Sequence, residues 1–304
     1  MKKKKVALVL SGGGARGIAH IGVIEELEKQ GYEITSIAGT SMGALVGGFY
    51  ALGKLEEYKE WLFTLDRFKV FTLFDFTLSR QGFVKGDKVL KKIKEFISDR
   101  RIEDLGIAYA AVAVDIIENK EVVFTSGSIF EAIRASISIP TVFTPVKSDH
   151  GLLVDGGVLD NLPVKYVKRN EGDMLVAVNV NANIPVDKPE LSRKEEKEKE
   201  SIYQKRIKEF YAQLKKIGNL THEEKSEEEK RNKHEERLDF FNLLNRTISL
   251  MTNRIADLTL QQHNPDLLIE VSHESCGIFD FFKAEEMVET GRYIAHKSLL
   301  KHDN

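Results

Sequence analysis

The chain has 304 residues, and its 45 lysine and arginine residues nearly balance its 47 aspartate and glutamate residues, for a formal charge of −2. This balance argues against a nucleic-acid-binding protein, because such proteins carry a strong excess of basic residues, so we expect no nucleic acid partner. A hydrophobic fraction of 42% is typical of a globular chain with a large core rather than a disordered one.

The start of the chain is not typical of a secretory signal. Lys2 to Lys5 precede an apolar run, 6–10, that is too short for the hydrophobic region of a signal peptide, and no stretch approaches the roughly 20 apolar residues of a membrane helix. The single Cys276 excludes an intrachain disulfide. These observations predict a cytoplasmic location, with peripheral membrane contact as a further expectation.

Hydrophobic periodicity predicts strands and helices that alternate along the chain. Continuous apolar runs at 6–10 and 34–38 are typical of buried parallel strands, and helical patterns follow them at 18–27 and 41–52. We expect helices over most of 55–97 with a loop at 79–86, strands at 107–114, 122–124, 152–154, 174–180 and 267–271, and helices at 130–135, 238–260 and 284–300. This order predicts an α/β fold with a mostly parallel central sheet covered on both faces.

A serine between two glycines is the strongest functional signal. Ser41 lies at a strand-to-helix turn in the run from Gly39 to Gly43, where small residues permit unusual backbone angles and close packing. The helix N-terminus at this turn favours developing negative charge. The pattern predicts a nucleophile elbow; the alternative is an ordinary turn in which Ser41 caps the helix.

A glycine-rich loop follows the first strand. Gly12, Gly13, Gly14, Arg16 and Gly17 open the next helix, and their amides are suited to bind an anion. A dinucleotide-binding loop has the same glycine spacing, but it requires an acidic residue at the end of the second strand, which is missing here. Beside a nucleophile, the loop is better suited to an oxyanion hole. Arg16 either locks this loop or neutralises the anion, and the alternative is an ordinary solvated arginine.

Asp155 ends a strand before Gly156 and Gly157 and is the candidate general base for Ser41. We expect little to cover this turn, and an ordinary carboxylate is a weak base, so desolvation would have to raise the basicity of Asp155. The alternative role of Asp155 is to bond the amides of its own turn.

Histidine offers a competing catalytic arrangement. The chain order serine, aspartate, histidine fits an α/β-hydrolase triad with His263 or His273 as its third member. Neither histidine lies in a glycine-rich turn, and the elbow follows the second strand unusually early. His20 is expected to pack or cap, and no cluster has the spacing of a metal site.

The motifs together resemble the patatin-like phospholipases, particularly their small bacterial members. The resemblance runs from 6 to 180 and rests on four segments: Gly12–Gly17, Gly39–Gly43, Arg134–Ser136 with Pro140, and Asp155–Gly157 followed by Leu162–Val164. It implies a three-layer fold, hydrolysis of acyl esters, often of lipids, by a Ser41–Asp155 dyad with the glycine loop as oxyanion hole, and no metal or cofactor. The third motif reads Asp-Gly-Gly where many members carry Asp-Gly-Ala. A non-catalytic adaptor or regulatory protein on the same fold is the alternative function.

Two further segments bear on the substrate and on partners. An apolar run from Trp61 to Phe76 is expected either to line an acyl-chain channel or to belong to the core. We expect one hydrolase domain over 1–304, interrupted by a charged helical insertion at 187–237. Within it, a helix at 193–217 has an apolar seam and is predicted to mediate self-association into a homo-oligomer.

Overall fold

The computed structural model describes residues 4–74, 87–97, 100–140, 142–148, 151–189 and 240–302. The chain divides into two compact units, one formed by 1–187 with 250–304 and the other by 188–249. The predicted helix at 193–217 and nearly all of the 187–237 insertion lie outside the described residues, so the insertion and the self-association stay predictions.

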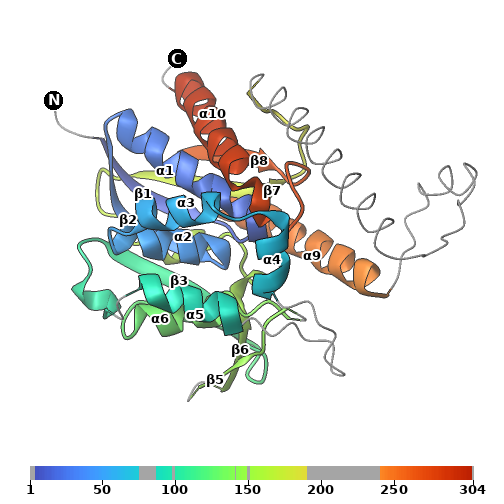
Figure 1. The fold of residues 1–304 in the computed structure, drawn as a ribbon. Coiled ribbons are helices and arrows are strands. Elements are labelled where there is room, and N and C mark those ends of the chain that lie inside the picture. Colours follow the sequence, from blue (N-terminus) through green and yellow to red (C-terminus); the bar gives the residue numbers. More distant parts are fainter. Residues whose placement is uncertain are drawn as a thin grey trace, which may run out of the picture. The chain divides into compact units, whose positions relative to one another are not determined.

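One mixed sheet of eight strands forms the centre of the larger unit (Figure 1). Its strands follow the order β5-β6-β3-β2-β1-β7-β8, with β4 paired to β3. The parallel strands are β1 (Lys4–Leu10), β2 (Tyr32–Thr40), β3 (Ala108–Asp115), β7 (Met174–Ala182) and β8 (Leu267–Ser272). β4 (Lys120–Phe124) and β6 (Gly151–Asp155) pair antiparallel with β3, and β5 (Val146–Ser148) pairs antiparallel with β6.

Helices cover both faces of the sheet. Successive side chains of a strand point to opposite faces, so a buried strand packs against a separate apolar cluster on each face. In β1, Val6, Leu8 and Leu10 pack in the main core, whereas Ala7 and Val9 pack in a second cluster that includes Ala256 of α9. The main core is built with α1 (Ala19–Lys29), α2 (Met42–Ala51), α3 (Leu55–Phe63), α4 (Arg67–Phe74), α5 (Asp87–Phe96), α6 (Ile129–Ser136) and α10 (Ala284–His302). The helix α9 spans Phe240–His263.

Short 3-10 turns complete the fold at η1 (Gly14–Ile18), η2 (Ile102–Asp104), η3 (Gly156–Val158), η4 (Val164–Tyr166) and η6 (Phe281–Lys283). None of the helices in the described part of the chain is both long enough and apolar enough to cross a membrane.

The predicted α/β architecture with a mostly parallel sheet is confirmed, and each predicted strand and helix in the described residues is present. The strand β5 was not predicted, since three residues are too short for a periodic pattern. The antiparallel direction of β4 and β6 also could not be read from the sequence, because strand direction depends on pairing.

The pairing around β3 brings two distant segments together. Ala111 pairs with both Gly39 of β2 and Phe124 of β4, and Ala113 pairs with both Val122 of β4 and Asp155 of β6. β4 occupies one edge of β3 at both Ala111 and Ala113. β2 and β6 therefore both pair with the other edge of β3, β2 at Ala111 and β6 at Ala113. The carboxyl ends of β2 and β6 therefore meet on that edge, which places the residue after β2 beside the last residue of β6.

Candidate active site

Ser41 occupies a strained elbow between β2 and α2. Its backbone angles are φ 54° and ψ −120°, a left-handed conformation that costs a non-glycine residue of the order of 1–3 kcal/mol. Ser41 stands at the N-cap position of α2, yet its hydroxyl makes no capping hydrogen bond. The ordinary-turn alternative, in which Ser41 caps the helix, is therefore not what the structure adopts, and the side chain is left for another role.

Close packing holds this elbow against the end of β1. A Cβ added to Gly43 would lie 2.2 Å from the Leu10 carbonyl oxygen, and one on Gly39 would lie 2.4 Å from the carbonyl carbon of Gly43. Neither approach is compatible with a side chain. The absence of a side chain at Gly39 and Gly43 thus lets strand, turn and helix pack at backbone distance.

Ser136, at the end of α6, clamps the elbow from the other side. Its hydroxyl donates a 2.6 Å hydrogen bond to the Val112 carbonyl of β3 and accepts a 2.9 Å bond from the Ser41 amide. The side chain is fully buried. Sequence reasoning gave this residue no role, although it lies in one of the four segments that carry the family resemblance.

Asp155 ends β6 at the point where β2 and β6 meet. Its Oδ1 accepts a 2.8 Å hydrogen bond from the Gly157 amide, so the turn-bonding alternative is also realised. Its side chain is only 6% exposed, and the expectation that little covers this turn is wrong. Burial raises the pKa of Asp155 to about 6, against the opposing effects of the neighbouring Ser41 hydroxyl and the Gly157 amide. This is the increase in basicity that a carboxylate base would need.

The close approach of β6 to β2 depends on the glycines after Asp155. A Cβ on Gly156 would lie 2.3 Å from the Val112 carbonyl oxygen, so no side chain fits there. A Cβ on Gly157 would lie 3.0 Å from Asn161 Oδ1 and 3.1 Å from Asp155 Oδ1. Both predicted turn glycines therefore lie in the crowded space around the Asp155 carboxyl group.

The glycine loop lies beside Ser41. A Cβ on Gly12 would be 3.1 Å from the Ser41 Cβ, and Gly14 lines the same pocket as Ser41. The Gly12 amide donates to the Asn161 carbonyl, and the Ala15 amide donates to the Ile278 carbonyl. Among the described residues, no acceptor is bonded to the amides of Gly13 and Gly14, which leaves these two donors available to a ligand.

Arg16 locks the loop rather than facing an anion. Its Nη2 and Nε donate to Asn181 Oδ1 at 2.7 and 3.2 Å, and its Nη1 approaches the carbonyl oxygens of His273 and Cys276. Asn181 Nδ2 donates in turn to the Gly12 carbonyl at 2.6 Å. Of the three alternatives for Arg16, these bonds favour the lock. Asn181 was not predicted, although a polar residue at the carboxyl end of a parallel strand is a recognisable signal.

Gly17 completes the loop by close packing. A Cβ there would lie 2.4 Å from Met42 Cγ, so the glycine makes room for the residue that follows Ser41.

No histidine joins Ser41 and Asp155 in the described part of the chain. His20 is fully buried, its Nε2 lies 2.8 Å from the Ser11 carbonyl oxygen, and burial lowers its pKa to about 4. His273 Nδ1 lies 3.2 Å from the Ala182 carbonyl oxygen, and His263 ends α9 in an exposed position. In the same residues, no group of three histidine, cysteine or acidic side chains is arranged to hold a metal ion.

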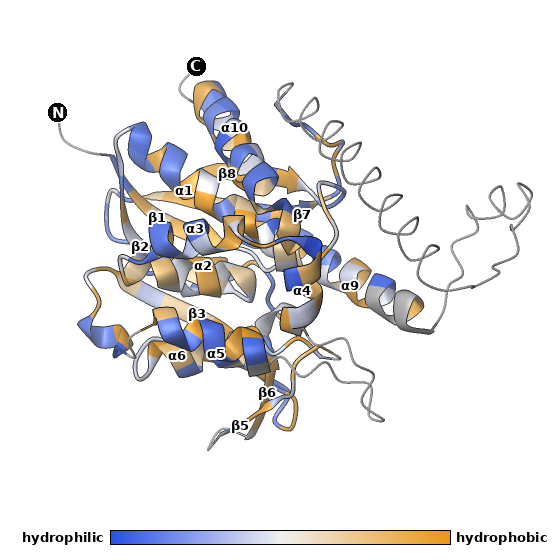
Figure 2. Cartoon of the chain, in the orientation of Figure 1, coloured by the Kyte–Doolittle hydropathy of each residue, from blue (hydrophilic) through white to orange (hydrophobic). Residues whose placement is uncertain are grey.

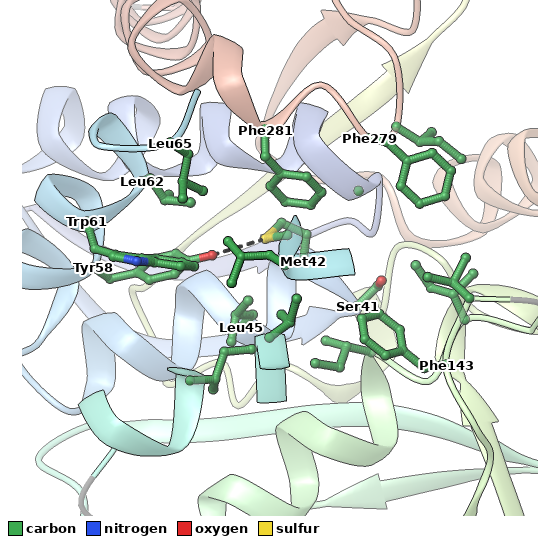
Figure 3. A pocket seen from close by; sticks show the side chains of 18 residues that line it. Ser41, Met42, Leu45, Tyr58, Trp61, Leu62, Leu65, Phe143, Phe279 and Phe281 are labelled. Atoms are coloured by element: carbon green, nitrogen blue, oxygen red, sulfur yellow. Dashed lines mark hydrogen bonds between the residues drawn. The ribbon is translucent and has the colours of Figure 1, made fainter. Parts of the chain in front are cut away.

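An apolar pocket opens beside Ser41 (Figure 3). It encloses about 660 Å³ of space not filled by atoms, part of it open to solvent. Ser41 lies at one end in Figure 3, and Tyr58 and Trp61 lie at the other. The loop between β8 and α10 closes one side with Ile278, Phe279 and Phe281.

The predicted apolar run contributes to this pocket only in part. Trp61, Leu62, Leu65 and Leu73 line it, whereas Phe68 and Phe71 are exposed. The run therefore serves as pocket wall, core and surface in turn, because a helix presents successive residues in different directions.

Comparisons with known proteins identify relatives of this chain. Residues 8–168 match the family model described as patatin-like phospholipase. Uncharacterized NTE family proteins of Mycobacterium bovis and Mycobacterium tuberculosis are 34% identical over 332 residues, which cover 97% of this chain and 91% of theirs. The lysophospholipase NTE1 of Kluyveromyces lactis is 36% identical over 183 residues, 58% of this chain and 12% of the yeast protein.

Among solved structures, VipD from Legionella pneumophila aligns with a TM-score of 0.47 and 17% identity, over 99% of this chain and 67% of its own.

The family model covers more than half of the chain, and the mycobacterial relatives match along nearly all of it. The resemblance identified from the sequence is therefore confirmed: the chain belongs to the patatin-like phospholipase family, a family of acyl hydrolases.

Proposed function

We propose that this protein hydrolyses lipid acyl esters through an acyl-enzyme on Ser41, with Asp155 as the only side-chain base. The observation that carries the proposal is the meeting of these two residues at the shared edge of β3. There, a strained serine without a capping bond lies beside a buried carboxyl group whose pKa is raised to about 6.

The reaction proceeds in two steps that balance without a cofactor. Ser41 Oγ attacks the ester carbonyl carbon while its proton passes to Asp155, and the alcohol then leaves with that proton. Asp155 next takes a proton from water as the water oxygen attacks the acyl-serine carbonyl. Asp155 then returns this proton to the leaving Ser41 oxygen, which restores the hydroxyl and releases the fatty acid.

The glycine loop stabilises the negative oxygen that forms in each step. The amides of Gly13 and Gly14 are the donors, since the amides on either side of them are already bonded to Asn161 and Ile278 carbonyls. Arg16 and Asn181 hold the loop in place, so these donors are oriented before the substrate arrives.

The pocket supports a substrate with an apolar acyl chain. Its walls are almost wholly aliphatic and aromatic, which is typical of a site that binds an apolar ligand. The name of the yeast relative, lysophospholipase, is consistent with a lipid ester of this kind.

The test combines a covalent probe with turnover of p-nitrophenyl esters and lysophospholipids. We expect Ser41→Ala to abolish both labelling by a fluorophosphonate and turnover, with an unchanged circular dichroism spectrum. We expect Asp155→Asn to lower kcat by about a thousandfold, since a general base contributes roughly 10²–10⁴-fold.

His263→Ala and His273→Ala are the matched controls, and both should keep most of the activity. A loss in either that equals the loss in Asp155→Asn would replace the dyad with a triad. A folded wild-type chain that is neither labelled nor active would favour the non-catalytic adaptor instead.

A further inference from the structure

Helix α4 exposes a pair of aromatic side chains beside the pocket. Phe68 is 78% exposed and Phe71 is 58% exposed. They are three residues apart on one helix, so their side chains are neighbours. Val70 and Leu73 point inward from the same helix, and Leu73 lines the pocket. A single exposed apolar residue is ordinary, whereas an aromatic pair next to a ligand pocket is typical of an interaction surface.

Helix α5 contacts α4 and adds positive charge to this surface. Lys88 Nζ donates a 3.2 Å bond to the Thr72 carbonyl, which ties the two helices together, while Val89 and Ile93 line the pocket from inside. The two helices carry six basic and two acidic side chains, and Asp66 precedes α4, in a chain whose overall charge is −2. Figure 2 shows hydrophilic and hydrophobic colours mixed on both helices.

Part of this charge is not neutralised within the protein. Lys92 pairs with Glu95 at 2.8 Å, and Asp66 caps α4 by accepting a bond from the Lys69 amide. Lys69 and Lys91 form no ion pair with any residue that the structure describes: Lys69 Nζ donates a 2.7 Å hydrogen bond to the uncharged Thr64 carbonyl, and Lys91 acts on Glu95 only from a longer range. Exposed aromatic rings near lysines that form no ion pair are the features of a helix that lies in a membrane interface.

We propose that α4 and α5 dock this protein on an anionic lipid bilayer, with Phe68 and Phe71 inserted among the acyl chains and Lys69 and Lys91 near the headgroups. The attraction of basic segments to anionic lipid favours this occupant over an uncharged surface. The proposal rests on the proposed function, because docking here places the bilayer beside the pocket that leads to Ser41. Leu73, Val89 and Ile93 join the docking helices to that pocket.

Cosedimentation with lipid vesicles tests the proposal. The parent protein is the full chain with Ser41→Ala, so that the lipid stays intact. We expect it to bind vesicles of phosphatidylcholine mixed with phosphatidylserine and to bind phosphatidylcholine alone more weakly. Phe68→Ser with Phe71→Ser should weaken vesicle binding by about tenfold or more, since two buried aromatic rings are lost. Lys69→Glu with Lys91→Glu should abolish the preference for anionic lipid.

Two exposed positions elsewhere provide matched controls: Leu258→Ser on α9 and Lys301→Glu on α10 should leave binding unchanged. Equal binding by the parent and the double-serine variant overturns the proposal. The proposal is also overturned if light scattering gives the parent a mass above that of the monomer and only the double-serine variant has a lower mass, since a second copy would then cover the surface.

Turnover of a soluble p-nitrophenyl ester by the Ser41-containing chain separates docking from catalysis. We expect the docking variants to keep it. If the wild-type chain shows no turnover while vesicle binding follows the pattern above, the proposed function fails and the docking surface stands.

Discussion

The pH dependence of turnover should report the buried Asp155. Only the ionised carboxylate can accept the Ser41 proton, so kcat/KM should rise with pH through the pKa of Asp155 in the free enzyme. Burial sets that pKa at about 6. The ionised fraction is then about one tenth at pH 5 and nearly complete at pH 8, whereas an ordinary aspartate would already be more than about nine tenths ionised at pH 5. We expect about a tenfold rise in kcat/KM over this interval.

The assay is the initial rate on a short-chain p-nitrophenyl ester, with the product measured after quenching in alkali so that its own ionisation does not distort the profile. Asp160 is the necessary control, because burial also raises its pKa to about 6. Asp160→Asn should keep the acid limb near pH 6. An acid limb near pH 4, or one that disappears in Asp160→Asn, would refute the assignment of Asp155 as the base.

The same burial should lower stability at neutral pH. The pKa of Asp155 is higher in the folded than in the unfolded chain, so its contribution to stability is complete below pH 4 and is lost as pH rises through about 6. A shift of about two units corresponds to about 3 kcal/mol as an upper estimate. The free energy of unfolding in urea should therefore rise in Asp155→Asn relative to wild type between pH 4 and pH 7, although this variant is inactive. A constant difference across this range would contradict the burial argument.

Two substitutions test the surroundings of Ser41. Ser136→Ala should lower the free energy of unfolding by about 1–3 kcal/mol, because it leaves the Ser41 amide unpaired, and should lower kcat more than it raises KM; unchanged kinetics would mean that the clamp does not position the elbow. Leu45→Phe, about 6 Å along α2 from Ser41, should narrow the pocket and lower kcat/KM for palmitate esters at least about tenfold relative to butyrate esters. An equal loss for both esters would show that the acyl chain lies elsewhere.

Much of the architecture follows from local patterns. Continuous apolar runs such as 6–10 predict buried parallel strands, and the glycines around Ser41 predict a tight strand-to-helix turn. These properties depend on residues close together in the chain, so the sequence alone was sufficient for them. The order of the motifs was also sufficient to place the chain in its family, which the comparisons confirm.

The three-dimensional relations among these segments could not be read in the same way. Ser41 and Asp155 are 114 positions apart in the numbering, and they meet only because β6 runs antiparallel on the edge of β3 that β2 also uses. Strand direction and edge depend on pairing between distant segments, which no local pattern encodes. The clamp by Ser136 and the lock between Arg16 and Asn181 likewise join residues that are far apart in the chain.

The environment of Asp155 shows most clearly which properties the sequence determines and which the tertiary structure decides. An aspartate before two glycines suggests an open turn, and the sequence by itself determined only that a carboxylate stands there. Tertiary packing then buries the side chain and raises its pKa to about 6, because the carboxylate loses its contact with water when the sheet closes around it. Basicity is a property of the environment that distant segments build, so only the folded structure could decide whether this residue is suited to accept a proton.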